Sequence, residues 1–234
     1  MTHPNRIFRA MAGVFLSMVL AAPLAASTGE KQEAEALVDS ARITFTKVAT
    51  DEQMTWLRDN LHRAKGLLIF PQILKGGFIV GASGGSGVLI AKDPEKGWSD
   101  PAFYTIATAS FGLQAGAQAA QVVMMVMTQK GLDSLLTTKV NLGAGVSVAA
   151  GPVGVGAKAA TADIIQYSLT KGAFGGVSLD GAVIKVREKL NEAYYGKPVT
   201  PVDILVKRSV HNPQARGLIQ AVEQVERAQK KASE

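Results

Sequence analysis

The sequence predicts an α+β domain: an N-terminal helical pair, then a curved, barrel-like antiparallel β-sheet of many short strands, then C-terminal helices. Helical periodicity is confined to the two ends of the 234-residue chain. The middle consists of apolar runs of strand length that glycine, proline and aspartate separate. The 24 glycines and the low aromatic content of 6% favour a sheet with tight turns over a helical bundle.

The first 27 residues have the layout of a secretory signal peptide. Arg6 and Arg9 precede the apolar run "AMAGVFLSMVLAAPLAAS", which ends in small residues suited to cleavage. The sequence therefore predicts a signal peptide over 1–27, a single mature domain over 28–234, and a periplasmic or secreted location.

Charge and cysteine content exclude several function classes. Removal of Arg6 and Arg9 leaves 25 − 2 = 23 basic residues against 19 acidic ones, a net charge of +4. This excess permits attraction to an anionic membrane, whereas the basic and aromatic footprint of nucleic-acid binding is missing. The absence of cysteine excludes disulfides, thiol catalysis and thiolate metal sites.

Two helices are predicted before the sheet. Residues 30–48 carry an apolar stripe at helical spacing, formed by Ala34, Leu37, Val38, Ala41, Phe45 and Val48. A second helix is expected to begin with Thr50 and Gln53 as a capping box. Its apolar stripe consists of Met54, Leu57, Leu61 and Ala64.

The period then changes to that of strands. Three short strands are predicted in "KGLLIFPQ", "GGFIVGAS" and "GVLIAKD", and two or three more in "FYTIATASFGLQAGAQ" and "QVVMMVMT". The apolar run from Ala115 to Met127 is too short for a membrane span and is expected to be a buried strand. A short helix is expected in "QKGLDSLLTT", followed by an alternating strand from Val140 to Val148.

The last strands and helices complete the domain. "DIIQYSLTKG" and "FGGVSLDGAVIKV" are predicted strands, with Asp180-Gly181 as a hairpin turn. Thr200-Pro201 and Asn212-Pro213 are expected to begin two helical segments, the second carrying a buried stripe. That stripe consists of Ala215, Leu218, Ile219, Val222 and Val225.

The stretch "GASGGSGVLI" contains the G-x-S-x-G spacing of a serine hydrolase, with Ser83 as the nucleophile. Such an elbow needs a helix after the serine, and "VLIAKD" is too short before Asp93-Pro94. A triad of Ser83 and His211 with Asp163 or Asp180 stays open as the enzymatic alternative. Phosphate-loop spacings and clusters of metal ligands are missing, so no metal or cofactor is expected. The glycines are interpreted as the means by which the strands curl.

Five blocks of sequence, in matching order between about residues 63 and 195, resemble the SYLF domain family. They are "AKGLLIFPQILKGGFIVGASGGSGVLI", "GWSDPAFYTIATASFGLQAGAQA", "VVMMVMTQKGLDSLL", "AAGPVGVGA" and "YSLTKGAFGGVSLDGAVI", with a helical extension over 200–231. The resemblance implies a non-enzymatic, phospholipid-binding domain of the bacterial exported type. In the family's eukaryotic adaptors, which bind phosphoinositides and in some cases actin, membrane binding is associated with a basic N-terminal helix. Here the first mature helix carries Glu30, Glu33, Glu35 and Asp39, so phosphoinositide specificity is not carried over. Actin binding is not carried over either.

The predicted lipid contacts are Arg63, Lys65 and Lys75, which flank the first pair of predicted strands. Each lysine or arginine near an anionic surface contributes about 1 kcal/mol to binding. The expected function is therefore phospholipid or membrane association in the cell envelope, without catalysis. The alternatives are an envelope protein–protein interaction or self-assembly module, including a homo-oligomer, and the Ser83 hydrolase.

Overall fold

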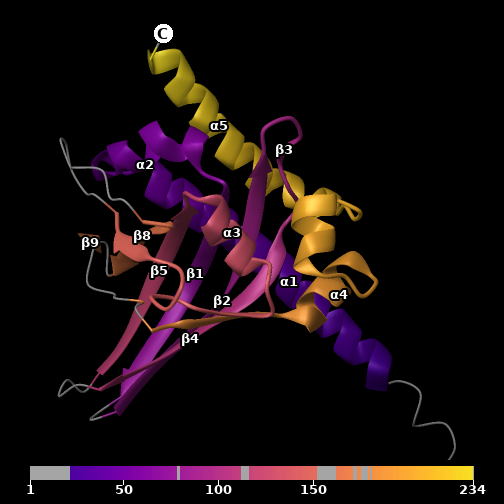
Figure 1. The fold of residues 1–234 in the computed structure, drawn as a ribbon. Helices are drawn as coiled ribbons and strands as arrows, with labels where there is room; N and C mark the ends of the chain where they lie inside the picture. Colours follow the sequence, from indigo (N-terminus) through magenta and orange to yellow (C-terminus); the bar gives the residue numbers. More distant parts are fainter. Residues whose placement is uncertain are drawn as a thin grey trace, which may run out of the picture.

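The computed structural model describes residues 22–77, 80–111, 116–151, 162–170, 173–174, 179 and 181–233. Helices come first, a curled sheet follows, and helices end the chain, which confirms the predicted α+β class (Figure 1). The predicted signal peptide stays a prediction, because residues 1–21 lie outside the described residues and 22–27 belong to the first helix.

Ten strands form one sheet with the order β6-β10-β4-β2-β1-β5-β8-β7, while β3 pairs with β2 and β9 with β8. Their bounds are β1 Gly66–Gly77, β2 Val80–Asp93, β3 Gly97–Trp98, β4 Ala102–Phe111, β5 Gly116–Val126, β6 Lys139–Asn141, β7 Val148–Ala150, β8 Ile164–Thr170, β9 Ala173–Phe174 and β10 Val183–Val186. All the pairs are antiparallel except β7 with β8, which is parallel. The sheet is therefore mixed at one edge, where the sequence predicted antiparallel pairing.

Two strand predictions are wrong in their boundaries. The three runs predicted as separate short strands are two long ones, β1 and β2, and the whole "GASGGSGVLI" stretch lies inside β2. The predicted strand from Val140 to Val148 is broken after β6 by a turn, in which Gly143 and Gly145 have φ of 86° and 99°. Of the predicted Asp180-Gly181 turn, Gly181 has φ of 75° and Asp180 lies outside the described residues.

A β-bulge at Pro71-Gln72 allows β1 to remain one strand. Between Ile69 and Leu74 the register with β2 shifts by one residue, and the register with β5 shifts at the same place. The bulge accommodates a proline, which cannot donate a ladder hydrogen bond, inside a central strand. It also bends the second half of β1 relative to the first.

The glycines of β2 lie opposite this bulge. A Cβ at Gly87 would lie 2.5 Å from the carbonyl oxygen of Ile69, and one at Gly85 would overlap the carbonyl oxygen of Gln72. Only glycine permits so close an approach of two backbones. The glycines thus serve the shape of the sheet, as the sequence predicted.

Helices precede and follow the sheet: α1 Ala22–Ala49, η1 Glu52–Met54, α2 Thr55–Asn60, η2 Leu61–Arg63, α3 Gln129–Leu135, α4 Glu188–Tyr195, η3 Val202–Lys207, η4 Pro213–Ala215 and α5 Arg216–Ser233. The predicted second helix is thus three short segments, and its N-cap is Asp51, which accepts from the Gln53 N–H at 2.9 Å. Thr50 is not the cap, because its hydroxyl donates to the Thr46 carbonyl. Asn212 caps η4 with Pro213 at its first turn, as predicted.

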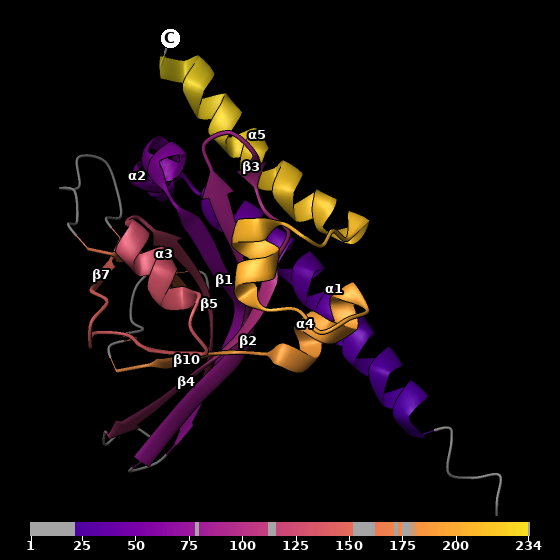
Figure 2. The same ribbon diagram turned by 45° about the vertical axis from the view of Figure 1, so that its right-hand side comes forward.

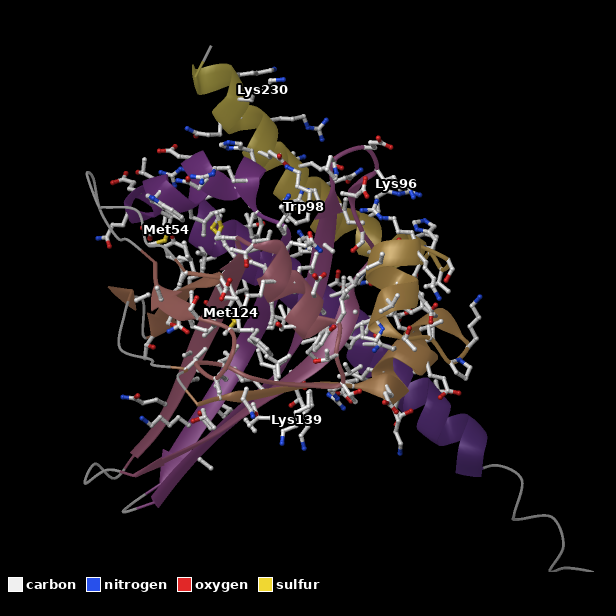
Figure 3. All side chains as sticks on the ribbon, viewed as in Figure 1. Met54, Lys96, Trp98, Met124, Lys139 and Lys230 are labelled. Atoms are coloured by element: carbon white, nitrogen blue, oxygen red, sulfur yellow. The ribbon has the colours of Figure 1, made fainter. Side chains whose placement is uncertain are left out.

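Helices cover both faces of the sheet around the first half of β1. On the face that we call the outer face, α1, α2, α4 and α5 pack on Leu67, Ile69, Val88, Phe103 and Val123. On the inner face, α3 and η3 enclose a second core with Phe70, Tyr104, Val122 and Met124. Figure 2 shows α3 on one side of the central strands and α1 and α5 on the other. Figure 3 shows Met54 beside α2, Trp98 beneath α5 and Met124 within the sheet.

The four central strands continue beyond this helical cover, toward the lower left of Figure 1. We call this part the sheet extension, formed by 71–77 of β1, 80–87 of β2, 105–111 of β4 and 116–121 of β5. None of the described helices is both long and apolar enough to cross a bilayer.

Asp163 joins three elements at the end of the sheet opposite the extension. Its carboxylate accepts from the Ser147 N–H and hydroxyl, both at 2.9 Å, and from the Thr128 hydroxyl at 2.7 Å, with Lys130 Nζ at 3.4 Å. The backbone bond from Ser147, then the two hydroxyls, hold the pKa of Asp163 well below its ordinary value. This buried carboxylate therefore fixes the starts of α3, β7 and β8.

Gly87→Ala and Gly85→Ala should each lower the free energy of unfolding by about 2 kcal/mol or more, because the new methyl group overlaps the backbone of β1. Urea denaturation measures the change. Gly76→Ala is the matched control, since no atom lies within 4 Å of its added Cβ, and it should leave stability unchanged or slightly raised. Equal effects at all three positions would contradict the packing role of the β2 glycines.

Asp163→Asn should lower the free energy of unfolding at pH 7 by about 2 kcal/mol, because it removes charge-assisted hydrogen bonds. A folded pKa below the unfolded value means that this stabilisation is full above the unfolded pKa and is lost as pH falls through the folded pKa. The difference between variant and wild type should therefore narrow on acidification from pH 7 to pH 3. Urea denaturation at both pH values, with the exposed Asp133→Asn as control, measures it; a constant difference would disprove the linkage.

Candidate functional site

The structure separates the three predicted lipid contacts. Arg63 ends η2, is exposed, and donates to the Asn60 side chain at 3.0 Å. Lys65 is half-buried beside the start of β1, where its N–H donates to the Val126 carbonyl at 2.7 Å. Lys75 is exposed near the other end of β1, roughly 30 Å along the strand from Lys65. A single headgroup cannot contact Lys75 together with Arg63 and Lys65, and their role in lipid binding stays a prediction.

Ser83 does not occupy a nucleophile elbow. It lies within β2, paired with Lys75 of β1 and Thr108 of β4, and β2 continues for ten more residues to Asp93. An elbow requires a sharp turn into a helix directly after the serine. The G-x-S-x-G spacing is therefore part of a regular strand.

The other members of the hydrolase alternative have structural partners. The Nδ1 of exposed His211 lies 2.9 Å from the Asp100 carboxylate, next to the Asn212 cap. Asp163 is engaged at the α3–β7–β8 junction, and Asp180 lies outside the described residues. In the part of the chain that the structure describes, no three histidine, aspartate or glutamate side chains gather as metal ligands.

The sheet extension carries no negative charge. The sequence has no aspartate or glutamate between Asp59 and Asp93 or between Asp100 and Asp133, stretches that include all four of its segments. Its outer face carries the exposed residues Leu74, Ala82, Ala107 and Ala119. The outer face of the extension thus exposes small and apolar side chains, the polar residues Gln72, Lys75 and Gln118 are exposed as well, and the extension contains no carboxylate.

A groove of about 470 Å³ lies between the C-terminal half of α1 and the extension. Its helical wall is formed by residues at i, i+3, i+4 and i+7, which share one face of α1. Its sheet wall comes from β1, β5 and β8, at the β1 bulge. The lining residues are Ser40, Ile43, Thr44 and Lys47 from α1, and Pro71, Gln72, Ala119, Ala120, Gln121 and Leu169 from the sheet.

Exposed apolar side chains gather at this groove. Ile43 and Leu74 are each 56% exposed, and with Val206 they are the large apolar residues found exposed in the described part of the chain. Leu74 is paired with Ala119 of the groove wall. The Gln121 amide donates to the buried Thr44 hydroxyl at 3.3 Å across the groove floor, while Lys47 is exposed at its rim. The groove therefore combines an apolar trough, neutral polar groups and one cation.

A second cavity, of about 590 Å³, has the opposite charge. It lies between α4 and η3 and is lined by Glu188, Glu192 and Asp203 together with apolar residues such as Val186 and Val199. The Thr200 side chain, then Lys207 and the Thr200 N–H, hold the pKa of Asp203 well below its ordinary value. Three carboxylates at one cavity oppose the binding of an anionic headgroup.

Sequence reasoning missed the groove, although the sequence contains two signals for it. Ile43 is an apolar residue outside the buried stripe of α1, and the acid-free stretches are visible in the printed sequence. The meeting of α1 with 119–121 could not be inferred, because these segments are more than 70 residues apart.

Comparison with known proteins identifies the family. Residues 107–225, about half of the chain, match the family model Ysc84, described as "Las17-binding protein actin regulator". LAS seventeen-binding protein 3 of Saccharomyces cerevisiae is 36% identical over 173 residues, which is 70% of this chain and 38% of that protein.

Two further relatives agree. Protein YSC84 of Saccharomyces cerevisiae is 34% identical over 171 residues (70% of this chain, 36% of that protein). The human SH3 domain-containing YSC84-like protein 1 is 30% identical over 167 residues (69% and 48%). This chain thus spans less than half the length of each relative. The family match and the identities together show that the chain belongs to the Ysc84 (SYLF) family.

Proposed function

We propose that this chain is a non-enzymatic protein of the bacterial cell envelope that associates with phospholipid membranes. The observation that carries the proposal is the sheet extension: long strands beyond the helical cover, without aspartate or glutamate, and with Leu74 exposed on the outer face. An apolar surface without carboxylates can approach an anionic bilayer without desolvating or repelling negative charge.

Two further observations support parts of this proposal. The predicted signal peptide over 1–27 supports the envelope location. The position of Ser83 inside β2 argues against the hydrolase alternative, because a serine held in a regular strand lacks the exposed geometry of an elbow.

A second candidate function is protein–protein interaction or self-assembly in the envelope. The names of the family and of the yeast relative, which describe binding to Las17, favour it. A mass that rises with protein concentration in analytical ultracentrifugation, combined with failure to bind vesicles, would select this function over the first.

Liposome flotation tests the membrane proposal. The mature protein should float with vesicles that contain phosphatidylglycerol and much less with pure phosphatidylcholine, because the net charge of +4 favours an anionic surface. Failure to float with either vesicle at low salt would disprove it. A serine hydrolase would instead show esterase activity that Ser83→Ala removes.

The predicted contacts at the two ends of β1 can be tested separately. If the headgroups bind at the start of β1, the double variant Arg63→Gln/Lys65→Gln should weaken vesicle binding roughly 30-fold, from two lost contacts of about 1 kcal/mol each. Lys75→Gln, roughly 30 Å along the strand, should then have no effect. Co-sedimentation over a range of lipid concentrations measures both; unchanged binding of all variants would exclude the three residues.

A further inference from the structure

We propose that the groove between α1 and the sheet extension binds one acyl chain of an anionic phospholipid, with Lys47 beside its phosphate. This inference rests on the proposed membrane association and assigns it to residues other than Arg63, Lys65 and Lys75. It also assigns the occupant: a single lipid molecule held by the protein at the bilayer surface.

The shape of the groove follows from the β1 bulge. Above the bulge, Phe45 and Val48 of α1 fill the space over Ile69 and Val123 of the outer face. At the bulge β1 changes direction. On the same face of β5, Gln121 is followed by the small residue Ala119. No large side chain of the described residues fills the resulting space, so a trough of about 470 Å³ stays open.

The size of the groove favours a small amphiphile over a protein partner. Pockets of roughly 300–1,000 Å³ suit a single small molecule, whereas a stable protein interface needs about 20–30 residues on each side. Ten residues line this groove. A macromolecular partner would have to extend well beyond it.

The chemistry of the lining selects an anionic lipid. The trough has apolar walls from Ile43, Pro71 and Leu169, which match an acyl chain. Lys47 is exposed at the rim, and no carboxylate lines the groove within the described residues. The Gln72 amide and the Ser40 hydroxyl can donate to ester or phosphate oxygens. A lysine ammonium above an apolar trough thus complements a phosphate attached to a hydrocarbon chain.

Leu74 extends this complementarity to the bilayer. It is 56% exposed, lies beside Ala119 in the sheet, and belongs to the extension that contains no carboxylate. A lipid seated in the groove would therefore stay in contact with its neighbours in the membrane across an apolar surface.

Two substitutions with matched controls test the site on the full mature chain. Lys47→Gln should weaken binding to phosphatidylglycerol vesicles about fivefold, while Lys139→Gln, an equal charge change on the edge strand β6, should not. Ala119→Glu, which places a carboxylate in the groove, should weaken binding by tenfold or more. Ala144→Glu, the same substitution at an exposed position in the turn after β6 and outside the sheet extension, should retain it.

The outcomes separate this inference from the proposed function. Wild-type binding with equal losses in Ala119→Glu and Ala144→Glu, or in both lysine variants, would overturn the groove while membrane association stands. If the wild type binds neither vesicle, the proposed function itself fails. Urea denaturation of each variant excludes loss of folding as the cause.

The lipid source is tested with soluble ligands. Short-chain phosphatidylglycerol below its micellar concentration should bind with a stoichiometry of one lipid per protein molecule. Isothermal titration calorimetry or a change in intrinsic fluorescence measures the binding, and Lys47→Gln should weaken the affinity. A free fatty acid that binds tightly when the phospholipid does not would overturn the phospholipid assignment, as would lipid binding that Lys47→Gln and Ala119→Glu leave unchanged.

Discussion

The close approach of β1 to β2 at the Pro71-Gln72 bulge determines the form of this molecule. Gly85 and Gly87 lack a Cβ, so the carbonyl oxygens of Gln72 and Ile69 can lie where side chains would otherwise stand. The bulge keeps β1 continuous through a proline and bends it. Because β1 and β2 lie at the centre of the sheet, this bend separates the covered half from the sheet extension.

The covered half holds the extension in place. Two cores, one on each face, pack around the first half of β1, and polar contacts attach the helices to strand ends. The Asn191 side chain of α4 accepts from the Phe103 N–H at 2.9 Å, and Glu226 of α5 accepts from the Trp98 indole at 3.1 Å and from Lys92. The extension has less of this cover, since α1 borders it at the groove and Arg187 donates to Ser86 of β2 at 2.8 Å. Its stability therefore depends mainly on ladder hydrogen bonds and on the adjoining core.

Much of the fold was predictable because the buried face of each helix appears in the sequence as an apolar stripe at helical spacing. The buried stripes of α1 and α5 were read from their period, and Asn212-Pro213 gave the start of η4. The strand boundaries could not be predicted in the same way. Proline and glycine usually end strands, but here Pro71 lies at a bulge inside β1 and the glycines of β2 pack against it. The alternation of apolar and small residues continues through the turn at 143–145, because Val146 is again buried in the core. The sequence pattern therefore gave no sign that the strand ends after β6.

The sequence contains the residues of the candidate site but does not show that they lie close together in space. Ile43 off the buried stripe and the acid-free stretches were both present in the printed letters. Basic residues beside the first strand were easier to notice, and they led to Arg63, Lys65 and Lys75. A long β1 places Lys75 far from the other two, and a tertiary contact of α1 with β5 creates the groove instead.

The distribution of charge indicates how such a protein would face a membrane. The N-terminal half of α1 carries Glu30, Glu33, Glu35 and Asp39, and the cavity beside α4 carries three more carboxylates. Arg187 pairs with Glu33 and Lys207 with Asp203, which reduces the repulsion, but carboxylates still disfavour an anionic bilayer on these sides, whereas the extension has none. A lysine near the surface contributes only about 1 kcal/mol, whereas a fully buried leucine or isoleucine contributes about 1.5–3 kcal/mol. In the proposed complex, apolar contact by the two exposed aliphatic side chains would therefore add to the attraction that the net charge of +4 provides toward an anionic surface.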